Sequence, residues 1–418
     1  MFTFMHAADL HIDSPLRGLP QYDGAPIDEI RHATRRALSN LVDLAITERV
    51  GFIVIAGDLF DGDWRDYNTG LFFIAEMARL REAQIPVYLV TGNHDAVSQI
   101  SKSLRLPDNV HRFDARKPET RVLETCGVAL HGQSFATRDT FEDLAATYPQ
   151  PIANCVNIGV LHTSATGGYG HDPYAPTSLE ILLAKGYDYW ALGHVHRRLA
   201  LHENPWIIYA GNTQGRHIRE TGAKGCTLVS VDNGQIRAVE HHDLDTLRWH
   251  LQEVAIDGQS EAGAVLDRIH QALSGLVGTI DRLHAVRVCL TGTSALHAQF
   301  RANPAHWTNE IRAIANDVGN GMLWVEEVRF TTTSPQAAPA ITNDAVGELV
   351  GMITAWSADD ARVETFAAEC RELALKLPPE FLTDADGLDP TNPAVIKAAL
   401  AEIGDLLQSG WQMTGGHA

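Results

Sequence analysis

The chain has 418 residues, of which 45 % are hydrophobic, and a formal net charge of −19. This length exceeds one ordinary domain, and the apolar content supports a sizeable core, which excludes a disordered chain. No apolar run approaches the roughly 18 residues that cross a membrane, and no signal peptide precedes the first predicted strand, so we expect a cytoplasmic protein without a membrane segment.

Five apolar segments of strand type are each followed by polar residues that can bind a metal ion. Because strands of such sheets end along one rim, we expect these residues to converge there. The segments and the residues that follow them are Phe2–Met5 with Asp9 and His11, Phe52–Ile55 with Asp58 and Asp61, Val87–Val90 with Asn93, His94 and Asp95, Val156–Leu161 with His162, and Tyr187–Leu192 with His194 and His196.

The residue types suit a pair of divalent cations. Two such ions about 3.5–4 Å apart need one bridging carboxylate and a shell of imidazole and oxygen ligands on each side. Asp58 is the predicted bridge. The remaining ligands are predicted to be Asp9, His11 and His196 for one ion, and Asn93, His162 and His194 for the other.

His94 is left without a metal to bind, so we expect it to hydrogen-bond a phosphate oxygen or to protonate the leaving group. Three glycines, Gly57, Gly92 and Gly193, stand at strand ends where the backbone must turn beneath a ligand. Each motif alone is weak, since a single Asp-x-His occurs by chance, but five in this order are specific. Asp61 and Asp95 either take part in the site or only cap turns and orient His94.

The rest of the chain alternates between helix and strand. A helix is predicted over Ile27–Arg49 and ends at Gly51, the alternation continues through Val90, and short strands begin near Arg121. This order predicts an α/β sandwich of two β-sheets flanked by helices over residues 1–243.

Residues 244–333 are predicted to form a separate small α+β unit. Its elements are expected at Trp249–Ile256, Ala262–Leu276, Ala285–Leu290, Ala305–Asn316 and Leu323–Thr331.

Residues 334–418 are predicted to be a linker, Ser334–Ala340, and a helical tail. The tail helices are expected at Asp344–Trp356, at Ala358–Leu377 after a Ser357 cap, and from Pro393 to just before Gly410 after an Asn392 cap. The last helix has an apolar stripe that either packs within the protein or docks a partner helix. The stripe consists of Val395, Ile396, Ala399, Leu400, Ile403 and Leu407.

Charge and cysteine content say less about function. Residues 331–418 hold 13 Asp and Glu against 4 Lys and Arg, so they account for −9 of the net charge. The basic groups near the predicted site, Arg197–Arg198 and Arg216–Arg219, either contact substrate or are solvated loop charges. The five cysteines lie far apart without a C-x-x-C pair and are interpreted as reduced and structural, with a thiolate metal site as the alternative.

The ordered signature resembles that of the calcineurin-like metallophosphoesterases over about residues 1–240. Within that superfamily the local sequence around the motifs is similar to that of the SbcD-type DNA repair nucleases, and most similar to that of the branch called YhaO. The stretches that carry this similarity are His6–Pro15, Ala56–Asp61 and Ala210–His217. Protein serine/threonine phosphatases differ from this chain at the second and third motifs, because their sequences there are G-D-x-V-D-R-G and G-N-H-E. Some archaeal and eukaryotic nucleases also differ, since they have a histidine where this chain has Asp61.

The resemblance implies a metal-dependent phosphodiesterase that hydrolyses DNA as an exonuclease in DNA repair. It implies the seven ligands above, a hydroxide between two ions as nucleophile, and His94 as the catalytic histidine, with Mn²⁺ favoured by the mixed ligands. It further implies that 244–333 is a capping domain that holds DNA, with a plain accessory domain as the alternative. The low-specificity candidates for substrate contact are Asp61, Arg216 and His217.

The implied partner is an SMC-like coiled-coil ATPase of the YhaN or SbcC type, bound through the C-terminal helices, and a homodimer is left open. Two other functions stay open. One is hydrolysis of a small phosphodiester such as a cyclic nucleotide, which needs the same core. The other is a non-catalytic docking subunit, which the complete ligand set disfavours.

Overall fold

The computed structural model describes residues 1–14, 26–61, 67–97, 104–165, 174–277, 281–335, 345–377 and 389–413. The chain divides into two compact units. The first unit contains Met1–Leu251, Ile280–Val286 and Met322–Glu326. The second contains Gln252–Thr279, Arg287–Gly321 and Glu327–Ala418.

Two six-stranded sheets form the first unit. One has the order β12-β11-β1-β2-β3-β4 and the other the order β5-β6-β7-β8-β10-β9. Their strands are β1 (Phe2–Ala7), β2 (Phe52–Ala56), β3 (Val87–Val90), β4 (Val110–Arg112), β5 (Glu119–Leu123), β6 (Val128–Gly132), β7 (Val156–His162), β8 (Tyr189–Gly193), β9 (Leu199–Glu203), β10 (Trp206–Tyr209), β11 (Gly225–Asp232) and β12 (Gln235–Asp243).

The central strands of both sheets are parallel. Strands β1 to β4 pair in parallel in one sheet, and β6, β7, β8 and β10 do so in the other. Strands β2 and β7 are buried along their whole length, which is why their sequences are nearly continuous apolar runs rather than alternating ones. The predicted α/β sandwich of two sheets is confirmed.

Aromatic and branched side chains fill the space between the two sheets. The ring of Phe4 stacks on Phe52 with centroids 5.0 Å apart and meets Tyr189 of the other sheet edge-on at 5.4 Å. Val54 and Val160 belong to the same buried cluster. Because these contacts join β1 and β2 to β7 and β8, they hold the ends of these strands in fixed relation.

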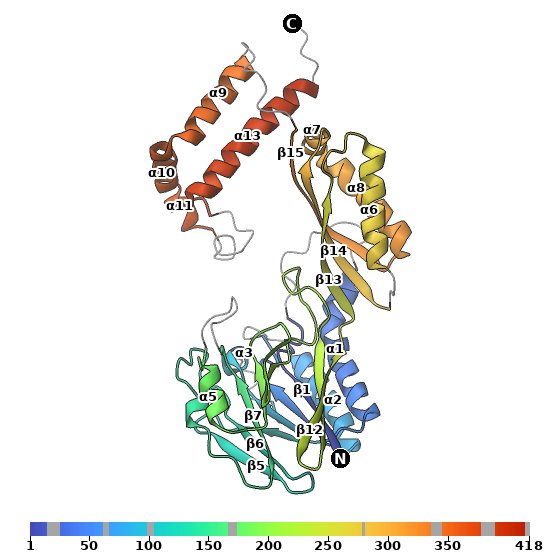
Figure 1. Cartoon of the computed structure of the whole chain (residues 1–418), viewed down its shortest axis with the longest axis vertical. Coiled ribbons are helices and arrows are strands. Elements are labelled where there is room, and N and C mark those ends of the chain that lie inside the picture. Colours follow the sequence, from blue (N-terminus) through green and yellow to red (C-terminus); the bar gives the residue numbers. More distant parts are fainter. Residues whose placement is uncertain are drawn as a thin grey trace. The chain divides into compact units, whose positions relative to one another are not determined.

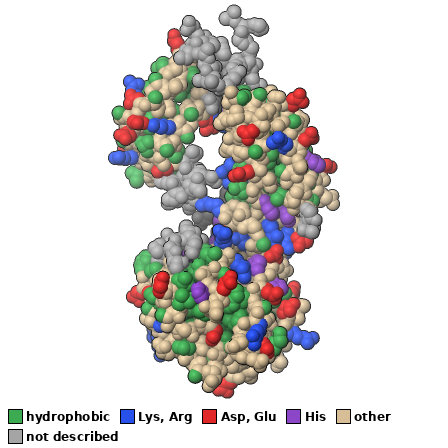
Figure 2. Space-filling view, in the orientation of Figure 1, with side chains coloured by type: hydrophobic (Ala, Val, Ile, Leu, Met, Phe, Trp, Pro, Cys, Tyr) green, Lys and Arg blue, Asp and Glu red, His purple; other side chains and the backbone are tan. Residues whose placement is uncertain are grey.

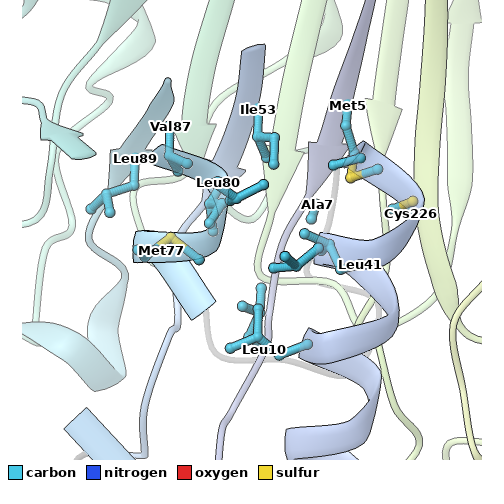
Figure 3. Close-up of a cluster of buried hydrophobic side chains, with 14 of the residues drawn as sticks. Met5, Ala7, Leu10, Leu41, Ile53, Met77, Leu80, Val87, Leu89 and Cys226 are labelled. Atoms are coloured by element: carbon cyan, nitrogen blue, oxygen red, sulfur yellow. The ribbon is translucent and has the colours of Figure 1, made fainter. Parts of the chain in front are cut away.

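Two helices, α1 (Ile27–Thr47) and α2 (Tyr67–Glu82), cover the outer face of the first sheet (Figure 1). Figure 3 shows the cluster beneath them, where Leu41 of α1 and Met77 and Leu80 of α2 meet side chains of β1, β2 and β3. The predicted helix reached Arg49, but α1 ends at Thr47 and Arg49 has a left-handed φ of 51°. The chain thus turns before Gly51.

The outer face of the second sheet packs against shorter elements. These are η1 (Ala145–Thr147) and α5 (Leu179–Ala184), and Ala145 and Leu182 bury their side chains with Trp190 of β8. Ser178 caps α5 by accepting a hydrogen bond from the Ile181 N–H. Each sheet is therefore covered on both faces.

The predicted order of strands and helices in 244–333 is observed, with one additional short helix that was not predicted. A third, parallel sheet has the order β13-β14-β15, and its strands contribute residues to both units. Strands β14 and β15 extend beyond their predicted bounds, β13 begins two residues earlier and ends one residue earlier than predicted, and α6 matches its predicted bounds. The elements are β13 (Leu247–Ala255), α6 (Ala262–Leu276), β14 (Leu283–Thr293), α7 (His297–Ala302), α8 (Pro304–Gly319) and β15 (Leu323–Thr333).

The tail is helical, but several predicted boundaries are wrong. Ser357 is not a cap, because α9 (Ala345–Ala358) runs through it. Asp359 caps the next helix instead, accepting a hydrogen bond from the Arg362 N–H. The predicted helix to Leu377 is divided into α10 (Asp360–Glu369) and α11 (Arg371–Ala374). Residues 336–344, including most of the predicted linker and Asp344, lie outside the described residues.

The last helix, α13 (Pro393–Met413), begins where predicted but continues past Gly410. A single glycine costs a helix only about 1 kcal/mol relative to alanine, which does not stop it. Asn392 accepts a hydrogen bond from the Ala394 N–H, as expected of a capping residue.

The apolar stripe of α13 packs partly within the second unit. Ile396 is buried against Val363 and Ala367 of α10, with Leu400 packed beside them. Ile403 lies on the same helix and is 46 % exposed. Figure 2 shows hydrophobic side chains exposed among acidic and basic ones over these helices. Some side chains of the stripe therefore pack within the protein, and others remain exposed for a partner helix.

No helix among the described residues is long and apolar enough to span a membrane. All five cysteines are free, in agreement with their predicted reduced state. None belongs to a candidate metal cluster among the described residues.

Candidate metal centre

The candidate ligands come from five strand ends of the first unit. Asp9 and His11 follow β1, Asp58 follows β2, and α3 (Asn93–Val97) starts directly after β3 with Asn93. His162 is the last residue of β7, and His194 and His196 follow β8. Since these strands are parallel within each sheet and the sheets face each other, their carboxyl ends meet at one edge. The structure brings all seven together.

The first cluster contains Asp9, His11 and His196, whose candidate ligand atoms lie within 4.8 Å of one another. The Nε2 atoms of His11 and His196 are only 3.2 Å apart. The Nδ1 atom of each ring is hydrogen-bonded to a carboxylate. His11 Nδ1 lies 2.6 Å from Asp61, and His196 Nδ1 lies 2.7 Å from Glu220. The two Nε2 atoms are therefore directed at a common point, an arrangement that suits a shared cation.

The second cluster contains Asp58, His162 and Asn93. The Nε2 atom of His162 lies 3.0 Å from the Asn93 side-chain oxygen and 3.4 Å from an Asp58 oxygen. The ring of His194 lies 5.1 Å from that of His162. The same Asp58 oxygen is 3.8 Å from His11 Nε2, so this carboxylate stands between the two clusters. That position is the one expected of a bridging ligand.

The backbone is strained at these residues. Asp9, His11, Asp58 and His194 all have left-handed φ angles, of 51°, 42°, 52° and 100°. Non-glycine residues rarely adopt this conformation, which costs on the order of 1–3 kcal/mol each and concentrates at functional sites. Each turn directs its side chain into the site rather than along the strand.

All three predicted glycines have a steric role, and a Cβ atom on Gly57, whose φ is 95°, would lie 2.4 Å from His162 Nδ1. A Cβ atom on Gly92 would lie 2.2 Å from an Asp58 oxygen, and one on Gly193 would lie 2.0 Å from the Ala56 carbonyl. These distances are far below van der Waals contact, so only glycine allows the ligand loops to approach this closely. The expectation that these positions lack a side chain for close approach is confirmed.

The electrostatics of the buried site favour a cation. Burial, together with the charge of Asp58, raises the pKa of Asp9 to about 6 despite the nearby His162. Burial disfavours ionised Asp58 as well, but His162 holds the pKa of this carboxyl well below its usual value. Burial opposes protonation of His162, yet Asp58 and Asp9 raise its pKa to about 9. Converging carboxylates thus require positive charge, which divalent cations would supply.

His94 lies at the mouth of the site. Its backbone N–H donates to Asp58, and its ring meets the His11 ring edge-on with centroids 5.0 Å apart. The side chain is 37 % exposed, whereas those of His11 and His162 are fully buried, so a substrate can reach it. Its Nδ1 is 3.4 Å from Asp61, and burial lowers its pKa, which favours a neutral ring.

Asp61 and Asp95 have different surroundings. Asp95 accepts hydrogen bonds from the backbone N–H groups of Leu59, Phe60 and Gly92, so it fixes two ligand loops. Burial raises the pKa of Asp95 to about 7. Asp61 instead contacts the imidazoles of His11 and His94. Asp95 therefore caps a turn, whereas Asp61 orients two histidines.

The proposed substrate-contact residues are partly enclosed. The Arg216 side chain is 15 % exposed and pairs with Glu220 at 2.9 Å and Asp61 at 3.6 Å. His217 is about half exposed and lies 3.7 Å from Glu220. Their contact with substrate stays a prediction.

Glu220 is the residue that sequence reasoning missed. It follows Arg216 at i+4, a spacing that signals an ion pair, but nothing in the sequence indicates its contact with His196, 24 positions away.

Comparison with known proteins agrees with this geometry. Residues 2–198 match the calcineurin-like phosphoesterase family model, and residues 249–333 match the middle domain of the metallophosphoesterase YhaO. The chain is 38 % identical over 296 residues to "Uncharacterized metallophosphoesterase YhaO" of Bacillus subtilis. The aligned region covers 70 % of this chain and 72 % of that protein. The chain belongs to the calcineurin-like metallophosphoesterases. The family resemblance inferred from the sequence is confirmed.

More distant relatives are also similar. The chain is 27 % identical over 289 residues to "DNA double-strand break repair protein Mre11" of Methanopyrus kandleri, covering 61 % of this chain and 59 % of that protein. A dimetal phosphatase from Danio rerio superposes with a TM-score of 0.34 at 14 % identity, covering 55 % of this chain and 92 % of that one. The protein TT1561 of Thermus thermophilus superposes with a TM-score of 0.33 at 11 % identity, covering 58 % of this chain and 99 % of that one.

Proposed function

We propose that this metallophosphoesterase hydrolyses DNA phosphodiester bonds with two divalent cations, preferably Mn²⁺. The observation that carries the proposal is the position of Asp58 between two clusters of imidazole and oxygen ligands. Mixed nitrogen and oxygen donors suit Mn²⁺ better than Ca²⁺ or Mg²⁺. The named role of the Mre11 relative in DNA break repair supports DNA as the substrate class.

The side chains have distinct roles in this proposal. Cations would be held by Asp9, His11 and His196 on one side and by Asn93, His162 and His194 on the other, and would polarise the phosphate and activate water. His94, at the exposed mouth, would donate a hydrogen bond to the phosphate or a proton to the leaving oxygen. Asp61 would orient the His94 ring through Nδ1.

The substrate class distinguishes this proposal from hydrolysis of a small phosphodiester. A cyclic nucleotide would need only the metal centre, whereas DNA needs additional contacts along the strand. We assign those contacts to residues 244–333 as a capping domain, because their match to a YhaO middle domain supports a module specific to this branch.

A nuclease assay tests this function. Linear double-stranded and single-stranded DNA should be degraded with Mn²⁺ and left intact with chelator, and 3′,5′-cyclic AMP should be hydrolysed far more slowly. Faster turnover of the cyclic nucleotide than of either DNA would overturn the DNA assignment while leaving the metal chemistry in place.

We further propose that the tail docks a coiled-coil ATPase of the YhaN or SbcC type. Exposed apolar side chains on α9 and α13, including Met352 and Ile403, support an apolar contact surface. Leu400 packs within the tail, so it is not part of that surface.

A pair of charge substitutions tests this docking surface. The double variant Met352→Glu, Ile403→Glu should lose co-purification with the ATPase but keep Mn²⁺-dependent hydrolysis of a model diester. Val122→Glu, which changes a similarly exposed apolar residue on β5, is the matched control and should bind normally. Retained binding by the double variant, or loss by both proteins, would contradict the assignment.

A further inference from the structure

Three imidazoles of the candidate metal centre, those of His11, His196 and His162, have different partners at Nδ1. His11 meets a carboxylate of Asp61 at 2.6 Å, and His196 meets one of Glu220 at 2.7 Å. His162 instead lies 2.9 Å from the neutral carbonyl oxygen of Ala56. A carboxylate partner makes an imidazole a more basic and better oriented ligand than a carbonyl does. Both imidazoles of the first cluster therefore have a carboxylate partner, whereas His162 of the second cluster has a carbonyl partner.

The proton positions follow from the distances. Ionised carboxylates only accept hydrogen bonds, so an Nδ1 atom 2.7 Å from Glu220 must carry the proton. The Nε2 atom of neutral His196 is then left with its lone pair, facing His11 Nε2 at 3.2 Å. Arg216 Nη2 also lies 3.1 Å from His196 Nδ1. Because that nitrogen carries a proton, Nη2 donates to Glu220, at 2.9 Å, and not to the imidazole.

Glu220 is held rigidly in this role. It is buried and accepts hydrogen bonds from the Arg216 backbone N–H at 2.8 Å and from the Asn212 side chain at 2.9 Å. A Cβ on Gly215 would come within 2.7 Å of the Glu220 carbonyl, so the loop closes tightly around this residue. The carboxylate also meets His196, the Arg216 guanidinium and His217, which is more than a surface ion pair needs.

Arg216 joins the two carboxylates. Its guanidinium lies 2.9 Å from Glu220 and 3.6 Å from Asp61, and its own side chain is largely enclosed. The planar guanidinium can bond two carboxylates at once without rearrangement. The imidazoles of the first cluster are thus oriented by one connected unit made of Asp61, Arg216 and Glu220.

We propose that Glu220 is a positioning residue for His196, and that Arg216 couples it to Asp61 so that the cluster of Asp9, His11 and His196 binds the first and tighter divalent cation. The second cluster, with the neutral amide of Asn93 and the carbonyl-paired His162, then fills at higher cation concentration. The inference rests on the two-metal function proposed above but not on its DNA substrate. Loss of such an outer partner lowers metal affinity roughly 10–100-fold.

Calorimetric titration of the full-length, metal-free chain with Mn²⁺ alone tests this order of binding. The wild-type protein should bind two ions in separable steps. Glu220→Gln, which keeps the size and one acceptor oxygen, should weaken the tighter step by about tenfold or more and leave the other step unchanged. Asn93→Ser should weaken only the weaker step.

Asp245→Asn is the matched control. Asp245 is another buried carboxylate of the first unit, paired with Arg248 at 2.8 Å and Arg282 at 2.6 Å, and it touches no imidazole of the site. It should lower the melting temperature without changing either binding step. If Glu220→Gln only lowers the melting temperature in the same way, the residue has a structural role and the inference is wrong.

A double-mutant cycle tests the coupling through Arg216. Arg216→Gln should weaken the tighter step as Glu220→Gln does, and the double variant should lose little more than the larger single effect, because both substitutions break one unit. Fully additive losses would overturn the coupling. The titration needs no substrate. Failure of the wild-type chain to bind two ions would refute the proposed function, whereas two normal steps unchanged by Glu220→Gln would refute only this inference.

Discussion

Asp58→Asn is expected to reduce the bound Mn²⁺ from two ions to at most one and to lower phosphodiester hydrolysis by about 10³-fold or more. Asp58 lies within 4 Å of imidazoles from both clusters, at 3.4 Å from His162 and 3.8 Å from His11. Asparagine keeps an oxygen that can accept from the His94 N–H but lacks the charge that attracts two cations. Elemental analysis of the dialysed protein and initial rates in saturating Mn²⁺ measure both effects.

Asp95→Asn is the control for this prediction. Asp95 is equally buried near Asp58, but it accepts hydrogen bonds from backbone N–H groups of the ligand loops rather than meeting an imidazole. This variant should retain two ions. Two ions bound with full occupancy in Asp58→Asn would show that another group bridges them.

His94→Ala should retain both ions but lose roughly 10²–10⁴-fold in rate, the scale expected for removal of a general acid. The side chain is 37 % exposed and belongs to neither predicted ligand shell, although its ring lies with His11 and Asp61 in a third group of possible ligand atoms. Burial lowers its pKa, so a neutral ring is expected near pH 7. Rates with a DNA substrate and Mn²⁺ content, compared with those of wild type, measure the two effects separately.

The choice of leaving group identifies what His94 does. A nitrophenyl diester needs no protonation of its leaving oxygen, so a general acid would matter much less for it than for DNA. Similar losses on both substrates would instead indicate stabilisation of the phosphate oxygens. His111→Ala, in a partly exposed histidine on β4 that stacks on Tyr88, is the control and should keep its rate. An unchanged rate in His94→Ala would leave this residue only a turn position.

Much of the site follows from the sequence because the strands are parallel. Each candidate ligand stands at or just after the end of an apolar segment, and parallel strands deliver their ends to one edge. The order of the motifs was therefore enough to predict that Asp9, Asp58 and His162 would meet, although 153 positions separate the first from the last. Residue type and spacing were also sufficient for family membership, and the comparisons confirm it.

Local signals were less reliable in the tail. Ser357 is a good capping residue, yet α9 continues through it and Asp359 caps α10. Serine and aspartate compete closely for such positions, so packing of neighbouring helices decides between them. The stripe on α13 was visible as a pattern, but only the contact of Ile396 with α10 separates its packed side chains from exposed ones such as Ile403.

The sequence by itself determined the order of the strand-end motifs along the chain, the types of the candidate ligands and the glycines beneath them, since these depend on local periodicity and on residue chemistry. Tertiary structure decided which groups support the ligands. The sequence left open whether Arg216 contacts substrate or is a solvated loop charge, and folding encloses it between Asp61 and Glu220. The partner of an imidazole nitrogen depends on loops that approach from distant parts of the chain, and neither propensity nor spacing encodes that approach.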